Sequence, residues 1–203
     1  MEKPATTKYP ILEVLKRRWS PRAFASTPVE PEKLNRIFEA TRWAASSFNE
    51  QPWRFIVATR EQREEYERLL SCLVETNQKW ARRAPVLGLT LAKKTFTKGG
   101  KPNRVYIHDV GLAMGNFTAQ AMAENLFVHQ VAGIDPERVM EIFAVPEDFE
   151  PIAGFAIGYH GGDPDQLPED WMVEAEKSPR SRKTFEEFVF TGRFGQPTDL
   201  ISE

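Results

Sequence analysis

The segment 105–126 constrains the fold of this sequence more than any other part. We interpret it as the longest helix of the chain, ending where Asn125 can adopt the left-handed conformation of a helix cap. Small residues are spread around its whole circumference: Gly111, Ala113, Gly115, Ala119, Ala121 and Ala123. Such a helix can approach other backbones closely, so we expect it in the centre of a fold or against a twin from a second chain.

The rest of the chain alternates irregularly between strand and helix patterns. Strands are expected at 53–59, at 85–92 and over the apolar run 151–161, and helices at 11–18, 31–45, 61–80 and 136–143. This order lacks a regular strand–helix–strand alternation, which predicts an α+β fold. With 203 residues, 41% of them hydrophobic, a single domain spanning 1–203 is sufficient.

Charge and composition exclude several classes of function. The formal net charge of −2 gives no attraction to nucleic acid. No apolar run approaches the roughly 20 residues of a membrane span, and the N-terminus lacks the apolar stretch of a signal peptide. Cys72 is the only cysteine, so we expect no intrachain disulfide, a cytoplasmic location, and core packing in preference to a nucleophilic role.

Common catalytic motifs are missing. No G-x-G-x-x-G follows a strand, and the Gly99-Gly100-Lys101 run lacks the spacing and hydroxyl of a Walker loop. The three histidines, His108, His129 and His160, are isolated, so we expect no metal site and no metal-dependent hydrolase. No serine has the flanking glycines of a nucleophile elbow.

Two polar segments remain as candidates. Residues 17–24, RRWSPRAF, gather guanidinium groups and a hydroxyl at a helix end, which suits a phosphate. Taken alone, the segment is by default interpreted as a solvated basic face. Residues 46–53, SSFNEQPW, place amides and hydroxyls directly before a strand, where they can bond the edge of a flat heterocycle. An ordinary capping turn is the alternative for this second segment.

Taken together, these segments and their successors resemble the nitroreductase family. The pattern R-x-S-x-R-x-F is followed by SS-x-N-x-QPW, by Asn77 before an AP-x-L strand, and by the helix D-x-G-L-A-x-G-N-F-x-x-Q-A-x-A-E. The loop 129–135 and the basic run 180–183 complete a resemblance that covers about 11–195. It implies a central mixed or antiparallel sheet flanked by helices, and FMN as cofactor.

The resemblance also implies residue roles. Arg18 and Ser20, joined by Arg180, Arg182 or Lys183, would hold the phosphate; Arg22 would lie near N1 and O2 of the flavin, where a cation stabilises the charge of the reduced ring. Asn77 would bond the pyrimidine edge, and the Ala132-Gly133 backbone would approach N5 and O4. Ser46, Ser47 and Asn49 would come from the other subunit. The complete set of expected cofactor contacts is Arg18, Trp19, Ser20, Arg22, Ala45, Ser46, Ser47, Asn49, Gln51, Asn77, Ala132, Gly133, Arg180 and Arg182.

Some positions depart from the family's pattern. Trp19 stands where arginine or histidine is usual, Ala45 where proline is common, and Trp80 about where some members have a lysine near the flavin. Asn125 and Phe127 replace glycines often found after the long helix. None of these changes removes a residue expected to contact the phosphate. With Trp80 in place of a lysine, the sequence does not determine the reduction potential of the flavin.

The implied activity is a single-site, ping-pong oxidoreduction. NADH or NADPH reduces the flavin, leaves, and a nitroaromatic, quinone or related small acceptor takes its place, without a protein acid or base. A homodimer is expected, with the tail 161–203 and its apolar FEEFVF segment crossing to the partner. The alternatives are a flavin protein of the same fold that sequesters or fragments FMN, and a structural dimer without flavin.

Overall fold

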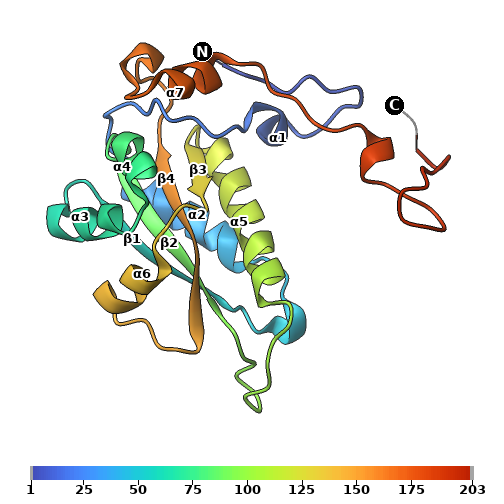
Figure 1. Ribbon diagram of the computed structural model, residues 1–203, viewed down its shortest axis with the longest axis horizontal. Helices are drawn as coiled ribbons and strands as arrows, with labels where there is room; N and C mark the ends of the chain where they lie inside the picture. The colour runs from blue at the N-terminus through green and yellow to red at the C-terminus, as the bar shows by residue number, and fades with distance from the viewer. Residues whose placement is uncertain (1, 202–203) are drawn as a thin grey trace.

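A four-stranded antiparallel sheet forms the centre of the protein in the computed structural model, which describes residues 2–201 (Figure 1). Its strand order is β1-β2-β4-β3, from β1 (Trp53–Thr59), β2 (Val86–Lys93), β4 (Phe149–Gly158) and β3 (Phe127–Val131). Every neighbouring pair is antiparallel. The predicted α+β fold is therefore confirmed, and the sheet is antiparallel and not mixed.

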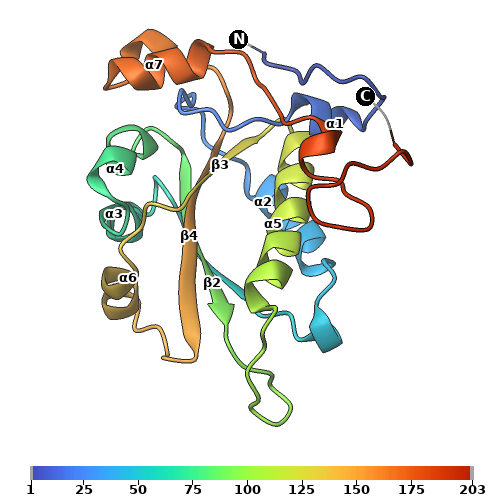
Figure 2. The same ribbon diagram turned by 45° about the vertical axis from the view of Figure 1, so that its right-hand side comes forward.

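Helices cover both faces of this sheet (Figure 2). One side carries α2 (Pro31–Arg42) and α5 (Tyr106–Ala123), and the other carries α3 (Arg63–Ser71), α4 (Glu75–Ala81) and α6 (Pro136–Ile142). Alternate residues of β2 enter two separate cores, since Leu87 and Leu89 pack on the α3 side and Val86 on the α5 side. The central strand is thus buried on both faces.

The long helix α5 lies over the sheet with only half of its circumference buried. Val110, Ala113 and Phe117 face the core, whereas Gly111 and Gly115 are exposed. The predicted left-handed cap is confirmed, because Asn125 has a φ of 59° and the Leu126 amide donates to the Ala121 carbonyl at 2.8 Å. The start of α6 also agrees with the helix expected at 136–143, because the Asp135 side chain caps the helix by accepting from the Arg138 amide.

Several boundaries differ from the sequence prediction. The helix expected at 61–80 is interrupted at 72–74, where Leu73 pairs with Ile134 and the Val74 amide donates to the Gly133 carbonyl at 3.0 Å. Strand β3 was not predicted, and α1 (Glu13–Arg17) is shorter than 11–18. Cys72 is a free thiol with no exposed surface, which confirms its packing role.

The C-terminal region is more structured than expected. It contains α7 (Asp170–Lys177) between the short 3-10 turns η2 (Pro164–Gln166) and η3 (Phe185–Glu187). Met172 of α7 is buried in its own chain, so the expectation that the whole of 161–203 leaves the domain is too broad. Beyond α7 the chain runs past α1 and away from the sheet (Figure 1), with Phe185 stacked on Tyr9 at 6.2 Å. Exchange of this arm between subunits stays a prediction.

Candidate functional site

Three arginines from the two ends of the chain meet beside one cavity. Arg18, Arg180 and Arg182 line a space of about 690 Å³ between residues 5–15 and 180–188. The Arg180 guanidinium donates to the carbonyls of Lys3 and Lys16, both at 2.9 Å, and the Arg18 guanidinium donates to Ser20 Oγ at 3.4 Å. The structure therefore brings Arg180 and Arg182 of the tail beside Arg18, and their role as phosphate contacts stays a prediction.

The charge of this arginine cluster is not compensated by an ion pair with any carboxylate of residues 2–201. Burial lowers the pKa of Arg18, and the neighbouring charges of Arg180 and Arg182 lower it further. Burial and then Arg182 lower the pKa of Arg180 in the same way. Among residues 2–201, no carboxylate forms an ion pair with any of the three. Cations concentrated in a partly enclosed cavity form a receptor for an anion.

Arg22 lies four residues after Arg18 in the segment 17–24, and one of its N–H donors has no partner among the described residues. Its Nε is buried and has no hydrogen-bond partner. The guanidinium carbon lies 5.0 Å from the ring centre of Trp171 and 5.9 Å from that of Trp80, so two indoles confine it. Burying an N–H donor without a partner costs free energy. An acceptor atom of a ligand at this place would give the Arg22 Nε–H the hydrogen bond that it lacks.

Asn77 and Gly133 meet next to Trp80. Asn77 Nδ2 donates to the Gly133 carbonyl at 3.1 Å, and Trp80 Nε1 lies 3.4 Å from Asn77 Oδ1. A methyl group added to Gly133 would lie 2.6 Å from Asn77 Nδ2, so only glycine allows this approach. Ala132, one residue earlier, is exposed. The structure thus joins Arg22, through Trp80, to the predicted Asn77 and Gly133.

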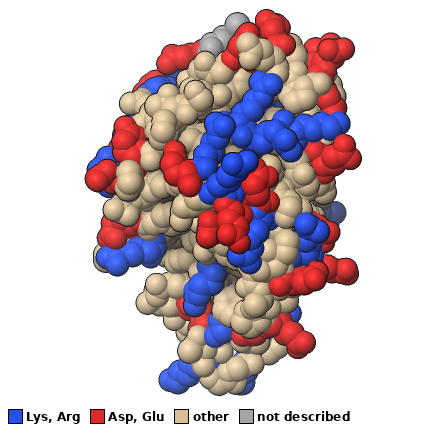
Figure 3. All heavy atoms as spheres, turned by 90° about the vertical axis from the view of Figure 1, so that its left-hand side faces the viewer, with Lys and Arg blue, Asp and Glu red and all other residues tan. Residues whose placement is uncertain are grey.

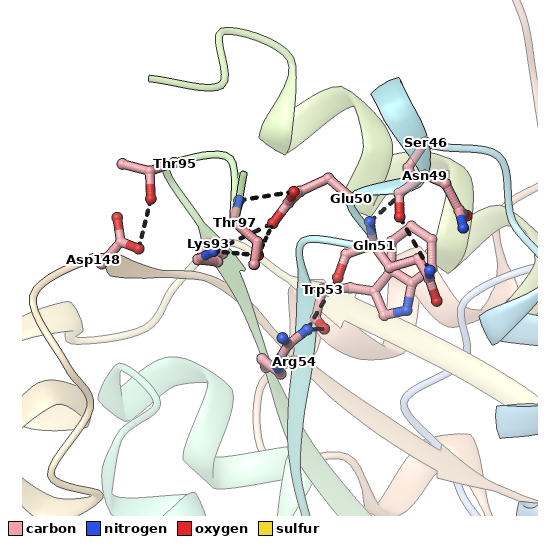
Figure 4. Close-up of polar contacts among 10 residues, drawn as sticks. All are labelled: Ser46, Asn49, Glu50, Gln51, Trp53, Arg54, Lys93, Thr95, Thr97 and Asp148. Atoms are coloured by element: carbon pink, nitrogen blue, oxygen red, sulfur yellow. Dashed lines mark hydrogen bonds and ion pairs between the residues drawn. The ribbon is translucent and has the colours of Figure 1, made fainter. Parts of the chain in front are cut away.

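The turn 46–51 lies elsewhere, near the start of α5 (Figure 4). The Ser47 amide donates to the buried carboxylate of Asp109 at 2.9 Å, and the Gln51 amide donates to Ser46 Oγ at 3.0 Å. Phe48, Asn49 and Gln51 all have positive φ angles, between 52° and 54°, which non-glycine residues seldom adopt. Ala45 beside them is exposed. The polar backbone of this turn is therefore fixed by its own chain.

The loop 93–104, which contains four lysines and two glycines, is tied to this turn. Glu50 accepts from the Thr97 amide at 2.9 Å and pairs with Lys93 Nζ at 3.3 Å (Figure 4). Thr95 Oγ1 donates to Asp148 at 2.8 Å on the other side of the loop. Phe96 brings its ring within 5.6 Å of Phe48, which is 92% exposed. Turn and loop form one surface with an aromatic pair.

Within one chain the two groups of predicted site residues are separated by the length of α5. The turn bonds Asp109 in the first turn of the helix, whereas Arg17, beside the cluster, donates to Asn125 beyond its end at 3.1 Å. Sixteen residues at 1.5 Å each place these anchors about 24 Å apart. Trp19 lies on the cluster side but is buried against Phe127 and His160.

On the face that carries α3 and α4, opposite charges are mixed. Figure 3 shows basic and acidic side chains interspersed on the side that carries α3 and α4. Lys79 of α4, for example, pairs with Glu169 at 2.7 Å and with Glu75 at 3.9 Å. The described residues contain no group of three or more metal-ligating side chains, and none of their helices is long and apolar enough to cross a membrane.

The sequence reasoning missed two groups near Arg22, both on α7. Trp171 faces the guanidinium, and the buried Glu176 accepts from the Arg22 and Ala23 amides. No signal marks them, because a charged segment between prolines does not predict a helix with a buried carboxylate. Asp109, by contrast, is part of the long-helix pattern and only its partner was unforeseen.

Comparisons with known proteins find several relatives of this chain. The sequence model of the nitroreductase family matches residues 15–159. A solved structure described as an oxidoreductase containing FMN is 35% identical and has a TM-score of 0.86, covering 93% of this chain and 95% of that chain. A protein of Streptomyces coelicolor named as an NADH dehydrogenase/NAD(P)H nitroreductase is 30% identical, over 72% of this chain and 82% of its own. The major NAD(P)H-flavin oxidoreductase of Aliivibrio fischeri is 26% identical, over 89% of this chain and 98% of its own.

Proposed function

This chain belongs to the nitroreductase family, and from that premise we propose that it is an NAD(P)H-dependent oxidoreductase that binds FMN between two copies of the chain. The observation that carries the proposal is the cluster of Arg18, Arg180 and Arg182, which forms no ion pair with a carboxylate in the described part of the chain. A phosphate dianion supplies the missing negative charge. The unpartnered Nε of Arg22 and the close approach at Gly133 fit the other end of the same cofactor.

Each group of residues then has a task. Arg18, Ser20, Arg180 and Arg182 hold the phosphate, and Asn77 with the Ala132-Gly133 backbone borders the ring. Arg22 provides positive charge where the reduced ring becomes negative. When bound, FMN supplies the chemistry of accepting a hydride from NADH or NADPH and passing it to an oxidised acceptor, such as a nitroaromatic or a quinone. The protein contributes position, charge and exclusion of water, and we assign no general acid or base.

The second copy of the chain supplies the turn 46–51. With about 24 Å between the turn and the arginine cluster along α5, Ser46, Ser47, Asn49 and Gln51 reach the same mononucleotide only from a partner subunit. The exposed side of α5 offers a surface for this partner. A cavity of about 350 Å³ there is lined by Ile107, Gly111, Gly115 and Ile152, and a Cβ on either glycine would meet nothing within 4 Å.

Location and partners follow the same proposal. The free and buried thiol of Cys72 suits a reducing cytoplasm. The partners are a second copy and small molecules, with neither nucleic acid nor a membrane, since the formal net charge is −2 and the face in Figure 3 carries mixed charges.

An absorbance spectrum and a reductive titration test the proposal. The purified protein, reconstituted with FMN, is expected to show a bound flavin spectrum that NADH or NADPH bleaches and that a quinone or nitroaromatic restores. Initial rates with both substrates varied are expected to give parallel double-reciprocal lines. Failure to bind FMN contradicts the proposal. Irreversible loss of the ring after reduction by NADH or NADPH, with oxygen as the sole oxidant, would favour a flavin-fragmenting protein of the same fold.

A further inference from the structure

The helix α7 contacts the segment that carries the predicted phosphate and ring contacts. Its Glu176 is 3% exposed, and the carboxylate accepts hydrogen bonds from the Arg22 amide at 2.9 and 3.2 Å and from the Ala23 amide at 3.0 Å. Burying a carboxylate is costly unless hydrogen bonds compensate for the lost water. Here the compensation comes from two consecutive backbone N–H groups, which fixes the main chain at Arg22.

The same helix contacts Arg22 through a second group. The ring centre of Trp171 lies 5.0 Å from the guanidinium carbon. The C-terminal end of α7 is held in turn by Lys3, whose Nζ donates to the carbonyls of Ala175 at 3.1 Å and Glu176 at 2.6 Å. Main chain and side chain of Arg22 are therefore both positioned by α7, an element outside the 15–159 span of the family match.

Glu176 also places a negative charge next to the cation expected at the ring. Burial lowers the pKa of Arg22, and the Glu176 carboxylate acts in the opposite direction. The carboxylate bonds the backbone and not the guanidinium, so the Nε of Arg22 stays available for a ligand. A fixed negative charge at this place reduces the positive potential that Arg22 presents to a bound ring.

We propose that Glu176 is a positioning residue of the flavin site, which holds Arg22 in place and lowers the flavin reduction potential. The inference rests on the proposed function, since it requires FMN beside Arg22. It adds a residue that contacts neither cofactor nor substrate and acts through Arg22.

The test compares Glu176→Gln with Glu174→Gln, the same change on the exposed side of α7. In the FMN-loaded protein, we expect Glu176→Gln to shift the midpoint potential to a more positive value, because the charge of Arg22 is then less compensated. We also expect the dissociation constant of FMN to rise about tenfold. The reason is that the carboxylate that accepts three hydrogen bonds from the Arg22 and Ala23 amides, and so positions Arg22, is lost. Glu174→Gln is expected to leave both quantities at their wild-type values.

Each outcome has one meaning. If wild-type protein binds no FMN, the proposed function fails before this inference is reached. If wild type binds FMN and folded Glu176→Gln keeps its potential and affinity, the inference is wrong. Should Glu176→Gln not fold, Glu176→Asp is used instead. We expect weaker FMN binding, because the shorter side chain does not reach both amides, and a wild-type midpoint potential, because the negative charge is kept. Unchanged FMN binding by Glu176→Asp would overturn the inference.

Discussion

The two ends of α5 differ in how their polar groups are satisfied. At one end, the guanidinium groups of Arg18, Arg180 and Arg182 lie together, and no carboxylate of residues 2–201 pairs with them. In the same described range, the buried Nε of Arg22 has no hydrogen-bond partner. At the other end, the turn 46–51 has its amides bonded to Asp109 and Ser46 within its own chain. The first end therefore keeps positive charge and a donor unsatisfied, whereas the second is already held in an uncommon backbone conformation.

This difference assigns distinct roles to the two ends. An end that lacks negative charge determines how tightly a phosphorylated ligand binds. A pre-formed turn contributes geometry at little further entropic cost, because its conformation is fixed before the ligand arrives. Variants of the arginine cluster should therefore lower FMN affinity without lowering the stability of the apoprotein. Variants of the turn 46–51 should lower FMN affinity less.

The largest effect is expected for Arg18→Ala combined with Arg182→Ala. Two charge-assisted contacts to phosphate contribute about 3 kcal/mol or more, so FMN affinity should fall more than about 100-fold. The apoprotein should be at least as stable as wild type, since the two charges repel one another. Fluorescence titration with FMN and urea unfolding of the apoprotein measure both quantities, with the exposed Arg104→Ala as control. If the double variant instead lost apoprotein stability by as many kcal/mol as it lost in FMN binding, the arginine cluster would stabilise the fold and not only the ligand.

His129 gives the arginine end a pH dependence. Its Nδ1–H donates to the Pro21 carbonyl at 2.9 Å, and burial lowers its pKa to about 4, from about 6.5 when unfolded. Folding disfavours protonation of the His129 imidazole, so keeping it neutral contributes to the free energy of unfolding. This contribution is complete above pH 6.5 and is lost as the pH falls toward 4. The total is about 3 kcal/mol.

Urea unfolding of wild type and His129→Gln between pH 7 and 4 measures this contribution. The variant should lose less stability than wild type over that interval, by up to about 3 kcal/mol. The difference isolates His129 from the carboxylates that both proteins protonate. Parallel pH profiles for the two proteins would show that the buried imidazole does not titrate in this way.

The smallest effect is expected at the turn. Asn49→Asp keeps a residue that tolerates positive φ but removes an amide donor, so FMN affinity should fall about tenfold. The side chain is exposed, and apoprotein stability should not change. Asn35→Asp on α2 is the matched control for the added charge. A loss of affinity as large as that of the double arginine variant would mean that the turn holds the phosphate.

Local patterns were sufficient for the elements whose residues interact mainly with near neighbours. The end of α5 at Asn125 and the start of α6 at Asp135 follow from single-residue preferences, and both are confirmed. The break between α3 and α4 could not be predicted, because the leucine spacing continues through it. Its cause is tertiary: Leu73 and Val74 bond Ile134 and Gly133 instead of continuing the helix.

The site shows the same division. The polar segments 17–24 and 46–53 were visible as clusters, but their distance in space was not, because it depends on the length and packing of α5. The link between Arg18 and the 180–182 run came only from the resemblance to a family. Glu176 could not be found at all, since a buried carboxylate contradicts the hydrophobic pattern that sequence reasoning uses.

Mixed dimers test most directly whether one flavin site is shared by two chains. One chain carries Arg18→Ala with Arg182→Ala, the other carries Ser47→Asp with Asn49→Asp, and two affinity tags isolate the mixed species. Each parent homodimer, checked for folding by circular dichroism, should bind FMN poorly. The mixed dimer should bind one FMN per two chains with wild-type affinity, because one of its sites combines an intact arginine cluster with an intact turn. Mixed dimers without any tight FMN site, or a wild-type monomer loaded with FMN, would contradict the shared site.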